Sequence, residues 1–274
     1  MAKKNVDEMS FLDHLEDLRW HLIRATLGIV IAASIAGFFY KFIFNVIIFG
    51  PTEMSFPTYK WLCKMSELIG MNDTTFCADE LPFIIQNRTV AGQFSAHIWT
   101  SIYAGFIIAF PYVLYQLWSF ISPGLRSNER KNSRGFLIVA SFLFFLGVLF
   151  GYYIVTPLSL NFLANYQVAD KISNEFDISS VIALVRSSSL ASGFVFELPI
   201  IIYFLTKVGL VTPQFLRKYR KYALVIVLIL SAIITPPDIA SQVIVAIPIL
   251  ILYQVSIYIS AIVVRNQKRK RKNV

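Results

Sequence analysis

The chain has 274 residues, of which 56% are hydrophobic and 15% are charged, and its formal net charge is +9. Soluble globular proteins carry about 25% charged residues, so this chain has too few polar side chains to cover the surface of a soluble protein. The apolar residues come in long blocks that lack the polar face of a soluble amphipathic helix. Composition therefore excludes an ordinary soluble helical bundle and predicts an all-α polytopic membrane protein.

The apolar blocks predict six transmembrane helices within a single membrane domain, residues 1–274, because about 20 apolar helical residues span a bilayer core. The fifth rises only about 21 Å at 1.5 Å per residue, so it either lies inside the bundle or thins the bilayer around it. A long outer loop, residues 50–93, follows the first span, and a basic cytoplasmic tail, residues 265–274, ends the chain. The predicted spans are about 22–49, 94–120, 136–158, 181–206, 222–235 and 243–264.

The distribution of basic residues predicts the orientation of these spans. The N-terminal segment, the second and fourth loops, and the tail hold most of the 25 Lys and Arg residues. Excess Lys and Arg marks the cytoplasmic side of a membrane. We therefore expect a multi-pass membrane protein with both termini in the cytoplasm. The positive charge is then explained by topology and by anionic lipid of the bilayer, not by nucleic acid.

The outer loop contains both cysteines of the chain, Cys63 and Cys77. Outside the cytoplasm a pair of cysteines at this separation can form a disulfide. The sequence does not give the distance between them, so two reduced thiols remain the alternative.

Signatures of catalysis are absent from the sequence. His, Cys, Asp and Glu do not occur at the spacing of a metal site, and there is no glycine-rich phosphate loop. No serine in a G-x-S-x-G elbow is present, and the last four spans contain no histidine. We therefore expect a protein that is not an enzyme, with no catalytic residue, no cofactor and no metal.

The stretch "MSFLDHLEDLRWHLIR", residues 9–24, predicts an amphipathic helix that enters the first span. Its leucines recur at helical spacing, and Ser10 with Asp13 fits a capping box at the helix start. Glu16, Asp17 and Arg19 lie on its polar face. The plain alternative is a solvated face with local pairs such as Asp17 to His21.

The loop "FISPGLRSNERKNSR", residues 120–134, contains one acid, Glu129, among four basic residues. Asp17 and Glu129 could form an acidic spot on a basic face and hold an incoming arginine. The alternative is an exposed ion pair of Glu129 with Arg126 or Arg130, which contributes little.

The third polar feature is Glu197 inside "SGFVFELPIIIYFL", residues 192–205. A carboxylate in the middle of a membrane costs about 2.5–3.5 kcal/mol on insertion scales and normally faces a bundle interior or a wet cavity. The alternative is a buried acid that is protonated, or one that bonds a neighbouring helix through a group such as Gln116.

Six short stretches, in order along nearly the whole chain, resemble the TatC family, the central integral subunit of the twin-arginine protein translocase. "HLEDLR" at 14–19 resembles the start of its first helix, and "YQLWSFISPGL" at 115–125 followed by "NER" at 128–130 resembles its second helix and first cytoplasmic loop. "FELP" at 196–199 resembles its fourth helix, and "TPPD" at 235–238 with "SQ" at 241–242 resembles its turn between helices five and six.

The resemblance implies a glove-like concave bundle of six helices in the bacterial cytoplasmic (inner) membrane that recognises signal peptides with paired arginines. It also implies TatA-like and sometimes TatB-like single-span partners, folded cargo proteins, the proton-motive force as energy source, and a homo-oligomer within a larger complex. The signal-peptide residues it implies are Asp17, Arg19, Glu129, Phe120 and Pro123. The intramembrane cavity or partner contacts are Glu197, Gln242 and Gln116, and the structural residues are Pro51, Pro236, Pro237 and Asp238.

The sequence departs from the family at one position. The family has glutamate where Asp17 stands, and here Glu16 and Asp17 follow one another. Aspartate is one methylene shorter but can still bind a guanidinium with both oxygens, and Glu16 is a second candidate for that role. A small-solute or proton-coupled secondary transporter with Glu197 as coupling acid is the alternative function, although it would predict an inverted repeat that the sequence lacks.

Overall fold

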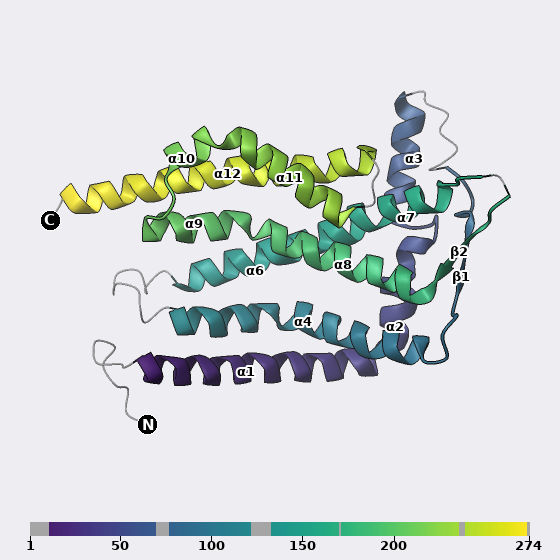
Figure 1. Ribbon diagram of the computed structural model, residues 1–274, viewed down its shortest axis with the longest axis horizontal. Coiled ribbons are helices and arrows are strands. Elements are labelled where there is room, and N and C mark those ends of the chain that lie inside the picture. Colours follow the sequence, from purple (N-terminus) through teal and green to yellow (C-terminus); the bar gives the residue numbers. More distant parts are fainter. Residues whose placement is uncertain (1–10, 70–76, 122–132, 170, 236–238, 273–274) are drawn as a thin grey trace. The chain divides into compact units, whose positions relative to one another are not determined.

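The computed structural model describes residues 11–69, 77–121, 133–169, 171–235 and 239–272, and these are mainly helical (Figure 1). The chain divides into two compact units. The first comprises residues 1–45 and 89–142, and the second comprises residues 46–88 and 143–274.

Two long helices, α1 (Phe11–Phe38) and α4 (Gly92–Ile121), form the first unit together with the start of α6. Their backbones approach closely at Gly105, where a Cβ atom would lie only 2.4 Å from the backbone nitrogen of Ala33. Small residues at a crossing allow such an approach, which is a common source of helix association in membranes. Glycine at position 105 is therefore required by the packing of α1 against α4.

After α1 the chain passes through three short helical segments before the outer helix α3. These are α2 (Tyr40–Phe42), the π-helical η2 (Ile43–Ile48) and the 3-10 turn η3 (Gly50–Thr52). Pro51, predicted to close the first helix on the outer side, is buried in η3. Its carbonyl oxygen lies 3.0 Å from the hydroxyl of Tyr59 in α3.

The second unit is built on two long helical paths. One runs through α6 (Ser133–Phe150), the π-helical η5 (Gly151–Val155) and α7 (Thr156–Asn165), and the other through α8 (Ile178–Phe196) and α9 (Leu198–Val208). A Cβ atom at Gly147 would lie 2.6 Å from the carbonyl oxygen of Ser192. One turn further on, Gly151 approaches Ser188 in the same way. The two glycines thus set the close packing of these paths.

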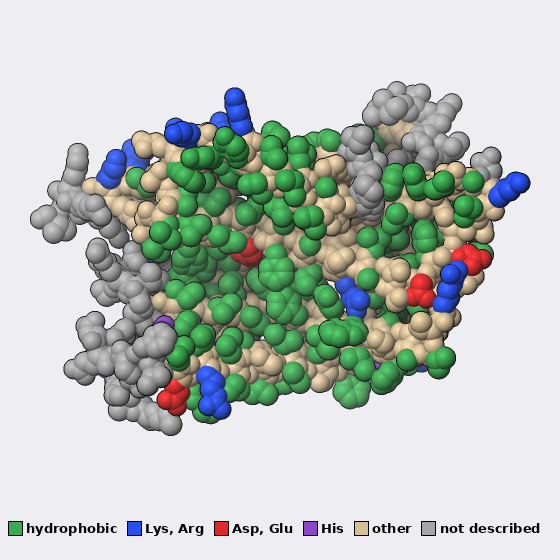
Figure 2. Space-filling model, in the orientation of Figure 1, with side chains coloured by type: hydrophobic (Ala, Val, Ile, Leu, Met, Phe, Trp, Pro, Cys, Tyr) green, Lys and Arg blue, Asp and Glu red, His purple; other side chains and the backbone are tan. Residues whose placement is uncertain are grey.

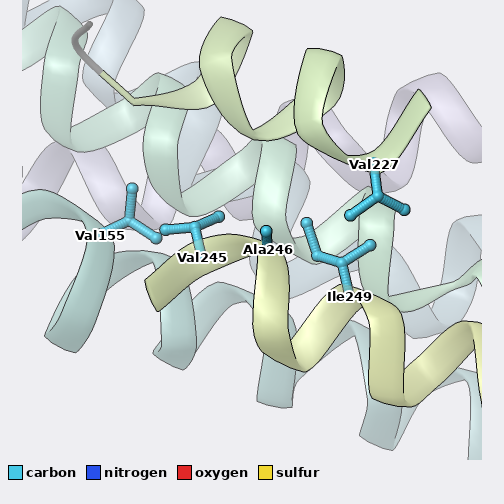
Figure 3. Close-up of a cluster of buried hydrophobic side chains, with 5 residues drawn as sticks. All are labelled: Val155, Val227, Val245, Ala246 and Ile249. Carbon is cyan, nitrogen blue, oxygen red and sulfur yellow. The ribbon is translucent and has the colours of Figure 1, made fainter. Parts of the chain in front are cut away.

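The remaining helices of the second unit are α10 (Pro213–Lys218), α11 (Arg220–Ile234) and α12 (Ile239–Lys272). Hydrophobic side chains from three segments meet between α11 and α12 (Figure 3). Thr206 of α9 also donates a 2.9 Å hydrogen bond to the hydroxyl of Ser260 in α12. The buried members of the cluster are Val155, Val227, Val245, Ala246 and Ile249.

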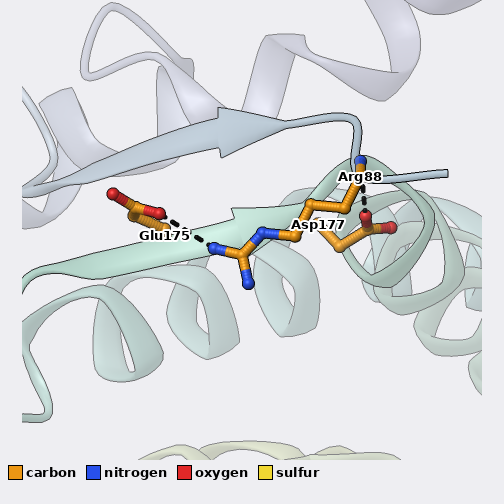
Figure 4. A network of polar contacts seen from close by, with 3 residues as sticks. All are labelled: Arg88, Glu175 and Asp177. Carbon is orange, nitrogen blue, oxygen red and sulfur yellow. Dashed lines mark hydrogen bonds and ion pairs between the residues drawn. The ribbon is translucent and has the colours of Figure 1, made fainter.

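A small parallel sheet joins the outer segments of this unit, which the all-helical prediction did not include. Strand β1 (Phe83–Gln86) pairs with β2 (Asn174–Asp177), with Phe83 opposite Asn174. Beside it, the Arg88 guanidinium donates a 2.8 Å hydrogen bond to Glu175, and the Arg88 backbone N–H donates to Asp177 (Figure 4). Asp177 also accepts a 2.9 Å hydrogen bond from the backbone of Ser179 and thereby caps α8.

Five helical stretches in the described part of the chain are long and apolar enough to cross a membrane. Hydrophobic side chains cover most of the face drawn in Figure 2, and charged side chains lie mainly toward its ends. The predicted all-α polytopic fold class is therefore confirmed. The predicted segment 222–235 corresponds to α11, which has only 15 residues, and six spans with cytoplasmic termini remain a prediction. The five stretches are His14–Phe38, Gly92–Ile121, Gly135–Asn165, Ile178–Val208 and Ser241–Arg269.

Candidate functional site

The first candidate site lies in the first unit, where the N-terminal end of α1 packs against the C-terminal end of α4. Nδ1 of His21 lies 2.7 Å from Oε1 of Gln116, and the Gln116 side chain is buried. On the other edge of the same ring, Nε2 lies 3.7 Å from a carboxylate oxygen of Asp17. The imidazole therefore connects Asp17 on α1 to an amide on α4, and the local pair of Asp17 with His21 that the sequence offered as an alternative is present.

Aromatic contacts hold Phe120 over this end of α1. Its ring stacks on His14 with centroids 4.4 Å apart, and it lies tilted against His21 at 6.4 Å. Sequence reasoning selected Phe120 but gave no site role to either histidine. The signal was available, since His14, Asp17 and His21 lie at helical spacings that bring them to one face of α1.

The predicted signal-peptide residues of α1 do not share one face. Successive residues of a helix turn by about 100°, so Arg19 lies about 200° around α1 from Asp17. Glu16 and Arg19 are exposed, whereas Asp17 is half-buried beside His21. Asp17 is therefore the carboxylate that faces the α4 side of the helix pair. Glu129 and Pro123 lie outside the described residues.

Two open apolar hollows lie along α1, on different sides of the helix. The first, of about 500 Å³, is lined by α1 alone among the described residues and includes Arg19. The second, of about 410 Å³, lies between α1 and α4 and is lined by residues on the same stripe of α1 as Asp17. The hollows share Leu27. The residues that line the second hollow are Arg24, Leu27, Gly28, Ile31, Ala32, Ile35, Ala109 and Tyr112.

Along the axis of α1 the two hollows together extend over the length of a bilayer core, but they lie on different sides of the helix. Leu18, Leu22 and Thr26 of the first lie about 100–180° around α1 from Asp17, whereas the second lies on the Asp17 side. From Leu15 to Ile35, α1 rises about 30 Å at 1.5 Å per residue, and a hydrocarbon core is about 30 Å thick. Their walls are mainly aliphatic, with Arg19 and Arg24 near the N-terminal end of the helix. The second hollow can therefore accept an apolar segment alongside α1 on the same side as Asp17.

The second candidate site is Glu197, in the second unit at the junction of α8 and α9. Pro199 has no backbone N–H to continue the helical hydrogen bonds, and the helix is interrupted at Glu197, which ends α8 and begins α9. The Glu197 residue is only 7% exposed, and its Oε1 has no hydrogen-bond partner among the described residues. A buried carboxyl group inside an apolar span is thus held at a break in the helix.

The other predicted intramembrane residues, Gln116 and Gln242, form side-chain hydrogen bonds within their own units. Gln116 accepts at its amide oxygen from His21, as described above. Gln242 of α12 donates a 3.0 Å hydrogen bond to the carbonyl oxygen of Leu228 in α11 and is half-buried. Gln242 therefore fastens α12 to α11, and its contact with a partner helix stays a prediction. The predicted structural residues Pro236, Pro237 and Asp238 lie outside the described residues.

The two cysteines are joined in a disulfide, with Cα atoms 5.1 Å apart. Together with Glu67 their side-chain atoms lie within 4.8 Å of one another, which is a spacing that could hold a metal. Zinc, however, binds thiolate sulfur, and these two sulfurs are bonded to each other. The arrangement therefore crosslinks α3 to the chain that follows it.

Fold and sites together define a polytopic helical membrane protein with a carboxylate–imidazole–amide chain at one end of a helix pair and a buried carboxyl group within a span. The sequence matches the family described as Sec-independent protein translocase protein (TatC) over residues 13–248. The chain belongs to this family.

Relatives and solved structures agree with this assignment. A Sec-independent protein translocase protein TatC from Blattabacterium sp. subsp. Periplaneta americana (strain BPLAN) is 44% identical, over 94% of this chain and 97% of the relative. One from Aquifex aeolicus (strain VF5) is 36% identical, over 96% and 100%. A crystal structure described as the twin arginine translocase receptor TatC superimposes with a TM-score of 0.68 at 32% identity, covering 92% of this chain and 99% of that chain.

Membership of this family makes the chain a membrane-embedded component of a protein translocase. The predicted resemblance is confirmed. The alternative of a small-solute or proton-coupled transporter receives no support, because the relatives and the structure named above cover nearly the whole chain and are translocase proteins.

Proposed function

We propose that this chain is the receptor subunit of a twin-arginine translocase, and that it binds the paired-arginine signal peptide of a folded cargo protein at the cytoplasmic face. Asp17 and Glu129 bind the guanidinium groups of the arginine pair by accepting hydrogen bonds from them. Arginine's planar fork suits a carboxylate better than the point charge of lysine does. The observation that carries the proposal is a half-buried carboxylate beside His21, on the same stripe of α1 as an apolar hollow between α1 and α4.

The apolar part of the signal peptide lies along the second hollow, between α1 and α4. Asp17 shares a stripe of α1 with Ile31 and Ile35, which line this hollow. Phe120, fixed by its stack on His14, forms an apolar wall at the entrance. Arginines at the membrane surface and an apolar segment below them then contact the same side of α1.

The topology that fits this role has six spans, with α11 as the short fifth and both termini in the cytoplasm of a bacterial inner-membrane protein. The basic residues Arg217, Lys218, Arg220 and Lys221 of α10 and α11 support this orientation, because basic residues are retained on the cytoplasmic side. TatA-like and TatB-like single-span subunits and further copies of the chain complete the complex, and the proton-motive force drives export.

Glu197 and Gln242 contribute to binding the transmembrane helices of partner subunits. Burial of Glu197 in an apolar span is costly, and its Oε1 has no hydrogen-bond partner among the described residues. A polar side chain on a partner's transmembrane helix would supply one. Gln242 holds α12 against α11 through Leu228 and so positions the surface that meets such a helix.

The experiment is a binding titration of a labelled twin-arginine signal peptide with the full chain in lipid nanodiscs. Asp17→Asn removes the charge but keeps the size, so a loss of about 10- to 100-fold in affinity is expected, because hydrogen bonds to charged groups contribute about 1.5–3 kcal/mol. Asp17→Glu should bind within a few-fold of the unchanged chain, because it keeps the carboxylate.

Controls separate charge recognition from general damage. Asp79→Asn removes an exposed acid of the outer loop and should leave binding unchanged. A peptide with two lysines in place of the arginines should bind weakly to the unchanged chain and lose little further in Asp17→Asn. Equal affinity of Asp17→Asn, Glu129→Gln and the unchanged chain for the arginine peptide would show that these carboxylates do not recognise it.

A further inference from the structure

The outer helix α3 (Pro57–Ile69) runs across the helices of its unit instead of along them. Figure 1 shows it crossing the direction of α7, α8 and α12, all of which belong to the second unit. Because α8 and α12 belong to apolar stretches long enough to cross a membrane, a helix at this angle lies parallel to the membrane plane.

Contacts with the span that contains η5 and α7 fix the rotation of α3 about its axis. Tyr59 is fully buried, and its hydroxyl lies 2.9 Å from the carbonyl oxygen of Pro157. The ring of Phe56, just before the helix, stacks on Tyr153 with centroids 5.4 Å apart. Thr58 donates a hydrogen bond to the carbonyl oxygen of Tyr153. One face of α3 is therefore held against the span.

The rest of α3 carries two exposed stripes of different chemistry. At about 100° per residue, one stripe contains Lys60, Lys64 and Glu67, which are all exposed. The other, which we call the apolar stripe, consists of Trp61, Met65 and Leu68, and these residues are 61%, 37% and 73% exposed. Exposed large apolar side chains gathered on one stripe of a helix mark an interaction surface.

The apolar stripe lies on the side of α3 that is nearer the middle of the span. Thr58 lies on the same side of α3 as Met65 and Trp61, and it contacts Tyr153, whereas Tyr59 contacts Pro157. Tyr153 lies four residues, about 6 Å, nearer the middle of the Gly135–Asn165 stretch than Pro157 does. The side of α3 that carries the apolar stripe therefore points toward the middle of the span, and the charged stripe points away from it.

The apolar stripe also continues an exposed apolar track on the span itself. Leu149 and Tyr153 are exposed, at 50% and 41%, and they lie one turn apart on the same side of the helix. Side chains of a span that are exposed in this way face lipid. The track reaches α3 at Thr58, next to the apolar stripe.

We propose that α3 is an interfacial anchor whose apolar stripe is embedded in the boundary between the lipid headgroups and acyl chains. Trp61 occupies the level at which tryptophan is enriched in membrane proteins, and Lys60 and Lys64 extend toward lipid phosphates from the water-facing side. The inference goes beyond the proposed function, and it depends on the proposed topology only for the leaflet concerned. A second protein chain on the same stripe is the competing occupant.

The experiment uses the full chain in liposomes with Trp61 as its one tryptophan, after Trp20, Trp99 and Trp118 are changed to phenylalanine. Lipids brominated high on the acyl chain should quench its fluorescence more than lipids brominated near the chain end, and iodide in water should quench it weakly. The matched control carries Trp61→Phe with Lys64→Trp, which moves the tryptophan to the charged stripe. Lipid quenching at position 64 should be at least about twofold weaker than at position 61, because that stripe faces water.

A second measurement does not depend on tolerance of the tryptophan changes. A photoreactive phenylalanine derivative is placed at position 61 or at position 64 in the otherwise unchanged chain, and the products are analysed by mass. Adducts with lipid acyl chains at position 61 but not at position 64 support the proposal. Strong quenching of Trp61 by iodide, or adducts at position 61 with protein alone, would overturn it in favour of an aqueous or a protein-covered surface.

Discussion

Nδ1 of His21 on α1 and Oε1 of Gln116 on α4 lie 2.7 Å apart, within a half-buried contact between residues 95 positions apart in the sequence. The pair joins the two helices at the end where Asp17 and Phe120 are also found. It therefore positions the acidic group of the proposed signal-peptide site as well as stabilising the first unit.

The first prediction concerns this pair. His21→Ala and Gln116→Leu should each lower signal-peptide affinity by a few-fold, because the imidazole that orients Asp17 is lost or loses its own support. A hydrogen bond of this kind contributes about 1 kcal/mol. The loss of binding free energy in the double variant should therefore be smaller than the sum of the two single losses by about that amount. Peptide titration on all four chains measures the coupling. Fully additive losses would show that the pair does not act as a unit.

The second prediction tests the helix crossing of the first unit. Gly105→Ala places a Cβ atom 2.4 Å from the backbone nitrogen of Ala33, and the helices must separate to accommodate it. Overpacking of this kind typically costs about 1–3 kcal/mol, which should lower the midpoint of thermal unfolding in detergent.

Gly135→Ala is the matched control for the crossing, since a Cβ there meets nothing within 4 Å. Alanine is also the better helix former by about 1 kcal/mol, so this variant should be neutral or slightly more stable. Equal destabilisation by the two substitutions would mean that the crossing is not the cause.

Much of this organisation follows from residue type alone. Long uncharged blocks predicted the membrane class, because a bilayer requires about 20 apolar residues for each crossing. Glu197 stood out because a carboxylate is rare in such a block, and the break of the helix there follows from Pro199, two residues later.

Other features depend on contacts between segments distant in sequence, which periodicity does not reveal. The bond of Gln116 to His21 and the pairing of β1 with β2, about 90 residues apart, are of this kind. So is the rotation of α3, which is set by Tyr59 against Pro51 and Pro157. The spacing of Asp17 and Arg19 also looked like one site, although a turn of about 200° places them on different faces of α1.

The third prediction concerns the disulfide between Cys63 and Cys77, which are 14 positions apart. Closing a loop of about 15 residues stabilises a folded segment by about 3 kcal/mol in the chain-entropy description. Cys63→Ser, or mild reduction, should therefore speed amide hydrogen exchange in α3 far more than in α1. Reduction of the Cys63→Ser variant supplies the control and should have no further effect. Unchanged exchange in α3 on reduction would contradict a stabilising role.

The fourth prediction is a pH dependence at the start of α8. Hydrogen bonds from the side chain and backbone of Ser179, and then from the backbone of Arg88, hold the pKa of Asp177 below its usual value. A carboxyl group whose folded pKa is lowered contributes stability that is fully present above its unfolded pKa, near 4, and is lost as the pH falls toward the folded value. The β1–β2 contact and the first turn of α8 should therefore loosen below about pH 4.

Protease cleavage of the outer segments, measured as a function of pH, tests this loss. Ser179→Ala removes the side-chain hydrogen bond that contributes most to the lowered pKa, so its cleavage should depend less on pH in the acidic range. Asp177→Asn keeps an acceptor for the Ser179 backbone but cannot titrate, and its cleavage should be flat through the same range. If Asp177→Asn still loosened on acidification as the unchanged chain does, another group would be the source, and the cap at Asp177 would not link the sheet to α8.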